Sequence, residues 1–282
     1  GTLIMILQPA EEAGQGSLAM INDGLFERFP RPDFNLALHV GSNAPAGSIG
    51  YHLGYAMANV DSVDIIIPGV GGHGAYPHTA IDPIVLSSQI VLALQTIVSR
   101  KINPLEPAVV TVGSIHGGLK HNIIPDEVKL QLTLRSYSDE VRDQTIQSIK
   151  RIVRGQAIAA GLPDDKMPKV ILKDEYTPAL YNDPDFSSKV LGFIKDEIGS
   201  ENVYEVPAVM GGEDFGRFGK QDPKIPSFLF WLGGTSKEDW KKFKRGDINL
   251  PSNHSPFFAP VPEPTLTTGV RAMTSSAIGL LQ

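Results

Sequence analysis

The sequence predicts an α/β protein in which one α/β domain is interrupted by an inserted domain with the ferredoxin-like order of elements. Three observations predict this fold. The 282 residues are enough for two ordinary domains. Between residues 61 and 176 the patterns run strand, helix, strand, strand, helix, strand. After Pro178 the chain changes to longer apolar runs and helices. We therefore expect one domain made of 1–60 and 177–282, and a second domain at 61–176.

Composition and charge exclude several classes of protein. Hydrophobic residues make up 41% and charged residues 20%, which is typical of a globular chain. The net charge is −6 without an excess of Lys and Arg, so no nucleic-acid partner is expected. Apolar runs such as 63–70 are too short and interrupted to span a bilayer, so no membrane partner is expected either. Cysteine is absent, which is compatible with any compartment and leaves His, Asp and Glu as possible metal ligands.

The first elements of the chain are two apolar strands separated by a short helix. Residues 3–7 have the pattern of a fully buried strand. Since a domain rarely begins inside its own central strand, we expect that a further N-terminal segment precedes this chain. A helix at 16–23 is expected to stop at Gly24, and a second strand at 34–40 is expected to end near His39.

The inserted domain and the last third of the chain follow from periodicity and capping residues. Asp82-Pro83 begins one helix with proline at its first position, and Ser138 caps a second. The alternation at 128–134 predicts a half-buried antiparallel strand. The remaining elements are expected as strands at 63–67, 109–115, 170–173 and 227–232 and helices at 183–198 and 264–281.

Two adjacent carboxylates, Glu11 and Glu12, follow the first predicted strand. Catalytic groups gather at the carboxyl ends of strands in open α/β sheets. Neighbouring carboxylates repel each other unless they share a cation or a proton. A metal would satisfy both, with one Glu as its ligand and the other as a general base. The alternative is a solvated pair at the N-terminus of the next helix, where the helix dipole favours acidic residues.

His39 and His254 are candidate partners of this pair. Imidazole nitrogen is a common ligand of zinc and of other transition metals. The alternatives are a hydrogen-bonded core histidine at 39 and a solvated loop histidine at 254. If the metal hypothesis is right, Glu12, His39 and His254 converge from three ends of the sheet.

Four further segments have polar residues in positions where function and simple structure are both possible. The Gly-rich segment 71–78 contains His73, and 117–125 contains Asn122; either segment could be a plain turn. Arg135 is either a surface charge or a carboxylate clamp. Glu213-Asp214 is either an acidic first turn of a helix or a support for a ligating histidine.

Six motifs occur along the chain in a fixed order. They are Gln8-Pro9-Ala10-Glu11-Glu12, 71–78 with Asp82-Pro83-Ile84, Asn122-Ile123-Ile124-Pro125-Asp126, Arg135-Ser136, Glu213-Asp214-Phe215 and His254-Ser255-Pro256. Together they resemble the binuclear metallopeptidases of clan MH, the aminoacylase and carboxypeptidase G group. The similarity is greatest to the amidohydrolase branch, which contains hippurate hydrolases, N-acyl-amino-acid deacylases and auxin-conjugate hydrolases.

The resemblance implies a fold, an activity and a cofactor. The expected fold is a mixed-sheet, zinc-peptidase-like (phosphorylase/hydrolase-like) catalytic domain with an inserted ferredoxin-like dimerisation domain, and a homodimer through 61–176. The expected activity is hydrolysis of an amide bond in an N-acyl amino acid or a small peptide-like substrate. The expected cofactor is two divalent metal ions, Zn²⁺ or Mn²⁺.

The resemblance also implies a role for each candidate residue. Glu11 resembles the general base, and Glu12, His39 and His254 resemble metal ligands. His73 resembles the histidine that the inserted domain supplies, often across a dimer, to polarise the scissile carbonyl. The remaining groups resemble substrate-holding residues (Asn122 and Arg135) and supporting residues (Glu213 and Asp214).

One departure from the family pattern limits the expected activity of this chain. The upstream Cys-Gly-His-Asp segment, which supplies further ligands in this branch, does not occur here. We therefore expect a partial or empty metal site and an inactive chain when it is taken alone. Two alternatives stay open, namely a non-catalytic dimerisation or binding protein with the same fold, and an aminopeptidase of the same clan.

Overall fold

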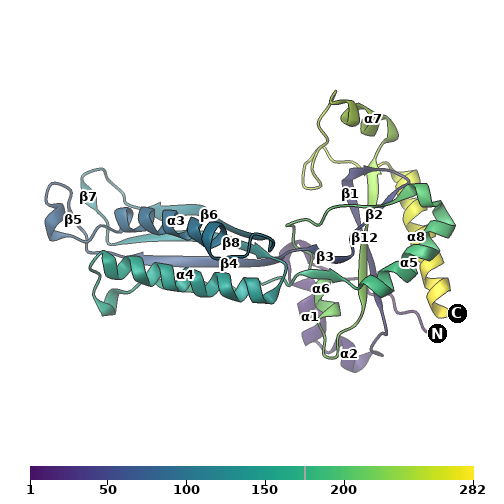
Figure 1. Cartoon of the computed structure of the whole chain (residues 1–282), viewed down its shortest axis with the longest axis horizontal. Helices are drawn as coiled ribbons and strands as arrows, with labels where there is room; N and C mark the ends of the chain where they lie inside the picture. The colour runs from purple at the N-terminus through teal and green to yellow at the C-terminus, as the bar shows by residue number, and fades with distance from the viewer. Residues whose placement is uncertain (175) are drawn as a thin grey trace. The chain divides into compact units, whose positions relative to one another are not determined.

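The computed structural model describes residues 1–174 and 176–282, which form two compact units (Figure 1). Unit 1 consists of Gly1–Ala56, Leu180–Val209 and Asp214–Gln282. Unit 2 consists of Met57–Ala179 and Met210–Glu213. The chain thus leaves unit 1, builds unit 2, and returns to unit 1, apart from Met210–Glu213, which belong to unit 2.

Unit 2 is built on an antiparallel four-stranded sheet with the order β6-β8-β4-β9. Its order of elements along the chain, β4-α3-β6-β8-α4-β9, is the predicted ferredoxin-like order, which is confirmed. The elements are β4 (Asn59–Pro68), β5 (Gly72–His73), η2 (Pro77–Thr79), α3 (Pro83–Arg100), β6 (Ala108–Gly117), β7 (Ile123–Ile124), β8 (Glu127–Ser136), α4 (Asp139–Ala159), η3 (Asp164–Lys166) and β9 (Lys169–Leu172).

The core of unit 2 lies between this sheet and the helices α3 and α4, which run alongside the strands in Figure 1. Strand β8 alternates buried and half-buried residues, as the sequence predicts. Both helices begin at the predicted caps, because Asp82 Oδ1 accepts a hydrogen bond from Ile84 N and Ser138 Oγ accepts one from Val141 N. The buried helix residues include Leu86, Ile90, Leu94, Ile97, Ile149 and Val153.

Helix α3 is long and apolar enough to span a membrane by length and composition alone, with a mean hydropathy of 1.3. The sequence reading did not single it out. In the structure, one face of α3 lies in the hydrophobic core of unit 2. Its apolar character is therefore accounted for in part by core packing.

Unit 1 is built on a mixed four-stranded sheet with the order β1-β12-β2-β11. Strand β1 is parallel to β12, β12 is antiparallel to β2, and β2 is parallel to β11, which confirms the mixed α/β fold class. The elements are η1 (Glu11–Ala13), α1 (Gly16–Asn22), α2 (Leu25–Arg28), β1 (Asn35–Pro45), β2 (Ile49–Tyr51), β3 (Gly54–Met57), β10 (Leu180–Asn182), α5 (Pro184–Ile198), η4 (Ser200–Asn202), β11 (Val203–Glu205), α6 (Gly216–Gly219), β12 (Ser227–Thr235), α7 (Lys237–Arg245) and α8 (Pro262–Leu281).

Helices α5 and α8 pack side by side against the sheet of unit 1, and β12 is its most buried strand (Figure 1). Phe228 and Phe230 are fully buried on β12, where they pack with Val190 and Ile194 from α5. This arrangement fixes β1, which lies next to β12 at the edge of the sheet.

Two sequence expectations for unit 1 are wrong. Residues 3–7 form no strand, and the side chains of Leu3, Met5 and Leu7 are 64–83% exposed. An apolar run becomes a strand only when a neighbouring strand pairs with its backbone, and this segment pairs with none of the described strands. The strand expected at 34–40 continues to Pro45, so His39 lies inside β1 instead of at its end.

Candidate functional site

The Glu11-Glu12 pair lies in a tight turn between two residues with left-handed backbone conformation. The short helix η1 contains both glutamates, and it follows Ala10 (φ 54°) and precedes Gly14 (φ 62°). In the described part of the chain, Ala10 is the one non-glycine residue with a positive φ angle. Such a conformation costs about 1–2 kcal/mol in a residue with a Cβ atom, so surrounding contacts must hold it.

The buried carboxylate of Asp214 provides those contacts. One of its oxygens accepts a hydrogen bond from Gln8 Nε2 at 2.5 Å, and the other accepts one from Ser17 N at 3.0 Å. Ser17 Oγ in turn donates to the backbone oxygen of Asp214 at 2.8 Å. Gln8 and Ser17 lie on either side of the turn, so Asp214 holds both of its ends. The sequence reading offered Asp214 as a support for a histidine, whereas these hydrogen bonds support the backbone around Glu11.

Glu11 is the glutamate whose protonation the surroundings favour. Partial burial raises its pKa, and the negative charges of Glu12 and Asp214 raise it further. The nearby His39 acts in the opposite direction, as does a backbone hydrogen bond from Asp214. A carboxyl with a raised pKa is better able to hold a proton during a reaction near neutral pH.

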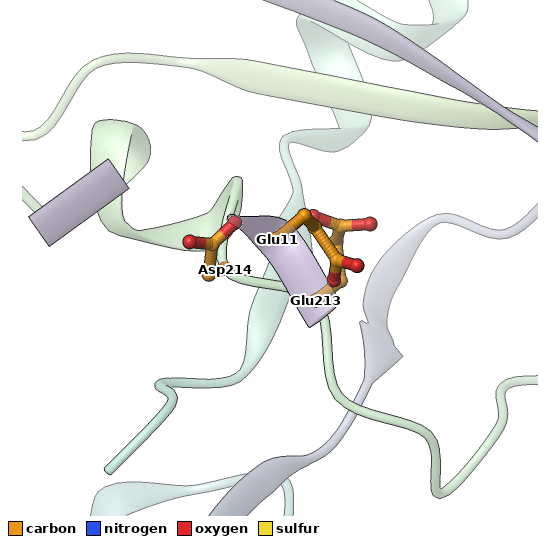
Figure 2. Close-up of side chains that lie close together, drawn as sticks. All are labelled: Glu11, Glu213 and Asp214. Carbon is orange, nitrogen blue, oxygen red and sulfur yellow. The ribbon is translucent and has the colours of Figure 1, made fainter. Parts of the chain in front are cut away.

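Figure 2 shows Glu11 with Asp214 and Glu213, the residue before Asp214 in the chain. Each of the three offers a carboxylate oxygen within 4.8 Å of the others. In the part of the chain that the structure describes, this is the one group of three possible ligand side chains within that distance of one another. It differs from the expected group of Glu12, His39 and His254. Because Asp214 already accepts hydrogen bonds from Gln8 and Ser17, we assign Asp214 to the support of the turn that contains Glu11.

His39 is oriented by a hydrogen bond to its own strand. Its Nδ1 lies 2.7 Å from the backbone oxygen of Val40. A carbonyl can only accept, so Nδ1 carries the proton and Nε2 keeps its lone pair. Histidines that bind metals through one ring nitrogen commonly donate the other ring N–H to a carbonyl or carboxylate in this way.

His254 lies beside Glu12, as the metal hypothesis expects. The distance from His254 Nδ1 to Glu12 Oε2 is 3.7 Å, and both side chains are 78% exposed. His39 does not form a close group with Glu12 and His254. It lies near enough to Glu11 to lower the pKa of that carboxyl. The structure therefore brings two of the three expected ligands together and places the third near the general-base candidate.

The chemistry of these donors fits a divalent transition-metal ion. Glu12 supplies carboxylate oxygen, and the two histidines supply imidazole nitrogen, the donor set that Zn²⁺ accepts and Mn²⁺ tolerates. The tautomer of His39 that its hydrogen bond selects leaves Nε2 available as a ligand atom.

His73 and Asn122 lie close together at one end of unit 2. Strands β5 and β7 form a small two-stranded antiparallel sheet that pairs His73 with Ile123, next to Asn122. Ala75 N donates a hydrogen bond to His73 Nδ1 at 3.1 Å. Nδ1 is therefore the acceptor, and the ring proton lies on Nε2, where it can be donated to a carbonyl oxygen.

Arg135 lies near the end of β8 in the four-stranded sheet of unit 2. Its Nε donates to Thr133 Oγ1 at 3.1 Å, and its Nη1 lies 3.4 Å from the backbone oxygen of Met210, three residues before Glu213. Burial lowers the pKa of the guanidinium, which nevertheless stays charged at neutral pH. Arg135 lies opposite Val60 of β4 and its side chain is half-buried, so it is more than a plain surface charge.

Sequence reasoning missed the residues that hold the candidates in place. Gln8, Ser17 and Asn253 all make hydrogen bonds to partners more than 190 residues away. Asn253 had one usable signal, because it directly precedes His254 in a polar loop. No local pattern identifies Gln8 or Ser17.

Comparison with known proteins gives consistent matches. Residues 52–160 match the peptidase dimerisation domain of the M20 family. The chain is 38% identical over 233 residues to the N-acetyldiaminopimelate deacetylase of Leuconostoc mesenteroides, covering 82% of this chain and 58% of that protein. It is 34% identical over 280 residues to thermostable carboxypeptidase 2 of Saccharolobus solfataricus, covering 99% of this chain and 66% of that protein. The chain thus spans about three fifths to two thirds of the length of these relatives.

A solved structure supports the same assignment at the level of the fold. The dinuclear metal binding peptidase YXEP of Bacillus subtilis, from the M20 family, superposes with a TM-score of 0.68 at 24% identity. The match covers 97% of this chain and 63% of that one. The resemblance drawn from the six motifs is thereby confirmed, and the chain belongs to the M20 family of peptidases and amidohydrolases.

Proposed function

We propose that the protein carrying this chain is a metal-dependent hydrolase that cleaves the amide bond of an N-acyl amino acid or a small peptide-like substrate. The observation that carries the proposal is the placement of Glu11 in the same turn as Glu12, which lies 3.7 Å from His254. A base beside two ligand-type side chains is the arrangement that metal-assisted hydrolysis requires. The relatives support it, because removing an N-acetyl group and trimming a peptide are both amide cleavages.

Glu12, His39 and His254 are the residues proposed to hold metal. We propose two ions, Zn²⁺ or Mn²⁺, for which this chain supplies part of the ligand set. When bound, such ions make a water molecule acidic enough to react near neutral pH. Glu11 accepts the proton that this water gives up and delivers it to the leaving amine nitrogen, so that the glutamate ends each turnover as it began.

We further propose that two copies of the chain complete one site. His73 lies beyond the start of β8 and Arg135 lies near its end. Residues 127 to 135 of one extended strand span about 27 Å at roughly 3.4 Å per residue. A small substrate cannot contact both groups of one chain. If Arg135 holds the substrate carboxylate, His73 and Asn122 must come from a second copy.

The surface of unit 2 offers features suited to such a homodimer through 61–176. Strand β6 lies at the edge of the sheet, where its backbone is available for pairing. Helix α3 exposes the large side chains of Val85 and Leu92. Exposed apolar residues beside an open strand edge favour association with another chain.

A hydrolysis assay tests the proposed function directly. The full-length protein is stripped with a chelator, reloaded with Zn²⁺ or Mn²⁺, and assayed on a panel of N-acetyl amino acids and dipeptides. We expect activity that depends on metal and that Glu11→Gln reduces by several orders of magnitude without loss of bound metal. Equal turnover by the stripped protein, or full activity of Glu11→Gln, would reject the proposal. Loaded protein without turnover on the whole panel would favour the non-catalytic alternative.

A further inference from the structure

The loop that carries His254 is attached to strand β1 by a side-chain amide. Ser42 N donates to Asn253 Oδ1 at 2.9 Å, and Asn253 Nδ2 donates to the backbone oxygen of Val40 at 2.9 Å. The nitrogen and the oxygen of the Asn253 side-chain amide thus both form hydrogen bonds with the backbone of β1. Residues 40 and 42 are 213 and 211 positions away from Asn253, so the contact is long-range.

This pair of hydrogen bonds imitates the pairing of a neighbouring strand. In an extended strand, the C=O of residue i and the N–H of residue i+2 point to the same side. The planar amide of Asn253 matches that spacing, which fixes the distance and the direction of residue 253 relative to β1. His254 follows with its Cα atom about 3.8 Å further along the chain.

The same carbonyl also orients His39. The backbone oxygen of Val40 accepts one hydrogen bond from His39 Nδ1 and one from Asn253 Nδ2. Packing does little to hold His254, because its side chain is 78% exposed. The position of His254 beside Glu12 must therefore come from its backbone, and Asn253 is the neighbour whose side chain ties that backbone to the strand.

We infer that Asn253 is a positioning residue of the metal centre, which aligns His254 with His39 through the shared carbonyl of Val40. This inference rests on the proposed function, in that it takes both histidines as metal ligands. Asn253 itself is not assigned as a metal ligand, since the oxygen and the nitrogen of its side-chain amide are both hydrogen-bonded to the strand. Removing the amide leaves the ligands in the chain but releases the loop, so metal affinity falls because a mobile ligand must be ordered again at binding.

Titration of the full-length protein, stripped of metal beforehand, with Co²⁺ alone tests the inference. The visible d–d absorption of Co²⁺ reports binding and ligand geometry without any need for turnover. We compare the unchanged chain with Asn253→Ala, Asn253→Ser and His254→Ala. The matched control is Asn202→Ala, which removes an amide that donates to the backbone oxygen of Ile198 in the same unit, away from the histidines.

We expect Asn253→Ala and Asn253→Ser to bind Co²⁺ about 10–100-fold more weakly than the unchanged chain, with an altered absorption band. Asn202→Ala is expected to keep the full affinity. Urea unfolding followed by the fluorescence of Trp231 and Trp240, which both lie in unit 1, checks that each variant is folded. The serine variant is included so that a folded Asn253 variant is available if the alanine variant is not.

The outcomes separate the inference from the function on which it rests. If His254→Ala weakens binding and both Asn253 variants bind like Asn202→Ala, Asn253 does not position the ligand and the inference is overturned. If His254→Ala binds Co²⁺ as the unchanged chain does, His254 is not a ligand, and the proposed metal site and the inference fail together.

Discussion

His39 and Asn253 donate hydrogen bonds to the same atom, the backbone oxygen of Val40, at 2.7 and 2.9 Å. One residue lies inside β1 and the other lies in a loop near the end of the chain. A single main-chain carbonyl therefore sets the orientation of one candidate ligand and the location of the loop that bears another. The site is organised by the backbone of β1 as much as by its own side chains.

The first prediction separates the two glutamates of the turn. Glu12→Gln is expected to lower the metal content of the full-length protein, because a neutral amide is a weaker ligand than a carboxylate. Glu11→Gln is expected to keep the metal. Metal analysis of both variants after dialysis against the same buffer makes the comparison. Loss of metal from Glu11→Gln with retention by Glu12→Gln would mean that the two roles are reversed.

The second prediction concerns His73. In the full-length enzyme, His73→Ala is expected to lower kcat by about 10²–10³-fold with metal content unchanged, if its Nε2–H stabilises negative charge that appears in the transition state. His78→Ala, which removes another histidine of the same loop, is the matched control and is expected to keep the activity.

Mixed dimers show whether His73 acts across the interface. Unfolding and refolding an equimolar mixture of Glu11→Gln and His73→Ala chains gives heterodimers with one complete site. The mixture should recover about a quarter of the unchanged activity, since half of the dimers are mixed and each has one of two sites intact. No recovery would place His73 in the site of its own chain.

The third prediction tests the support of the turn by Asp214. Asp214→Ala leaves the buried N–H of Ser17 without its acceptor, so the free energy of unfolding of unit 1 should fall by about 2 kcal/mol. Tryptophan fluorescence during urea unfolding measures it. Asp247→Ala, which removes an exposed carboxylate paired with Arg245, should change the free energy of unfolding by less than about 0.5 kcal/mol. Equal midpoints for the two variants would contradict the assigned role.

The fourth prediction concerns the acid stability of unit 2. Lys129 lies 2.8 Å from Asp64, and Gln131 and Lys173 each lie 3.2 Å from it; their hydrogen bonds lower the pKa of its carboxyl to about 2. A carboxyl whose pKa is depressed by folding stabilises the folded state above its unfolded pKa of about 3.9, and this contribution is lost as the pH falls toward 2. Since both lysines are partly exposed, we expect about 1 kcal/mol.

Asp64→Asn provides the test of that contribution. At pH 6 the variant should be less stable than the unchanged chain by about 1 kcal/mol, and the difference should shrink toward pH 2. Thermal unfolding followed by circular dichroism at several pH values measures the difference. Asp143→Asn, which alters an exposed carboxylate of the same unit, should show little difference at any pH. A constant deficit of Asp64→Asn across the range would point to lost packing instead.

The inserted domain was predictable because its signals are local. The alternation of β8, the helical stripe of α3 and the caps at Asp82 and Ser138 each specify an element without help from distant residues. Their order along the chain then restricts the topology to very few choices. The six motifs likewise identified the family, since motif order is a property of the sequence itself.

The wrong and missing predictions in unit 1 concern features that depend on residues distant in the sequence. Residues 3–7 have the composition of a buried strand, yet the composition cannot supply the neighbour that a strand requires. The role of Asn253 depends on hydrogen bonds to residues more than 210 positions away, and the role of Asp214 depends on Gln8 and Ser17. Such contacts join residues that are distant in the sequence, so the sequence could indicate the candidate ligands but not the groups that hold them.

The hydrogen bond from Ser42 N to Asn253 Oδ1 makes it possible to measure the opening of the loop that contains Asn253 and His254. This amide is protected from exchange with solvent deuterium only while the side chain of Asn253 is docked on β1. Its exchange rate relative to that of amides inside the β1–β12 ladder therefore measures how often the loop opens. The motion that would admit or release a ligand near His254 can thus be timed on the unmodified chain, without a label or a reaction.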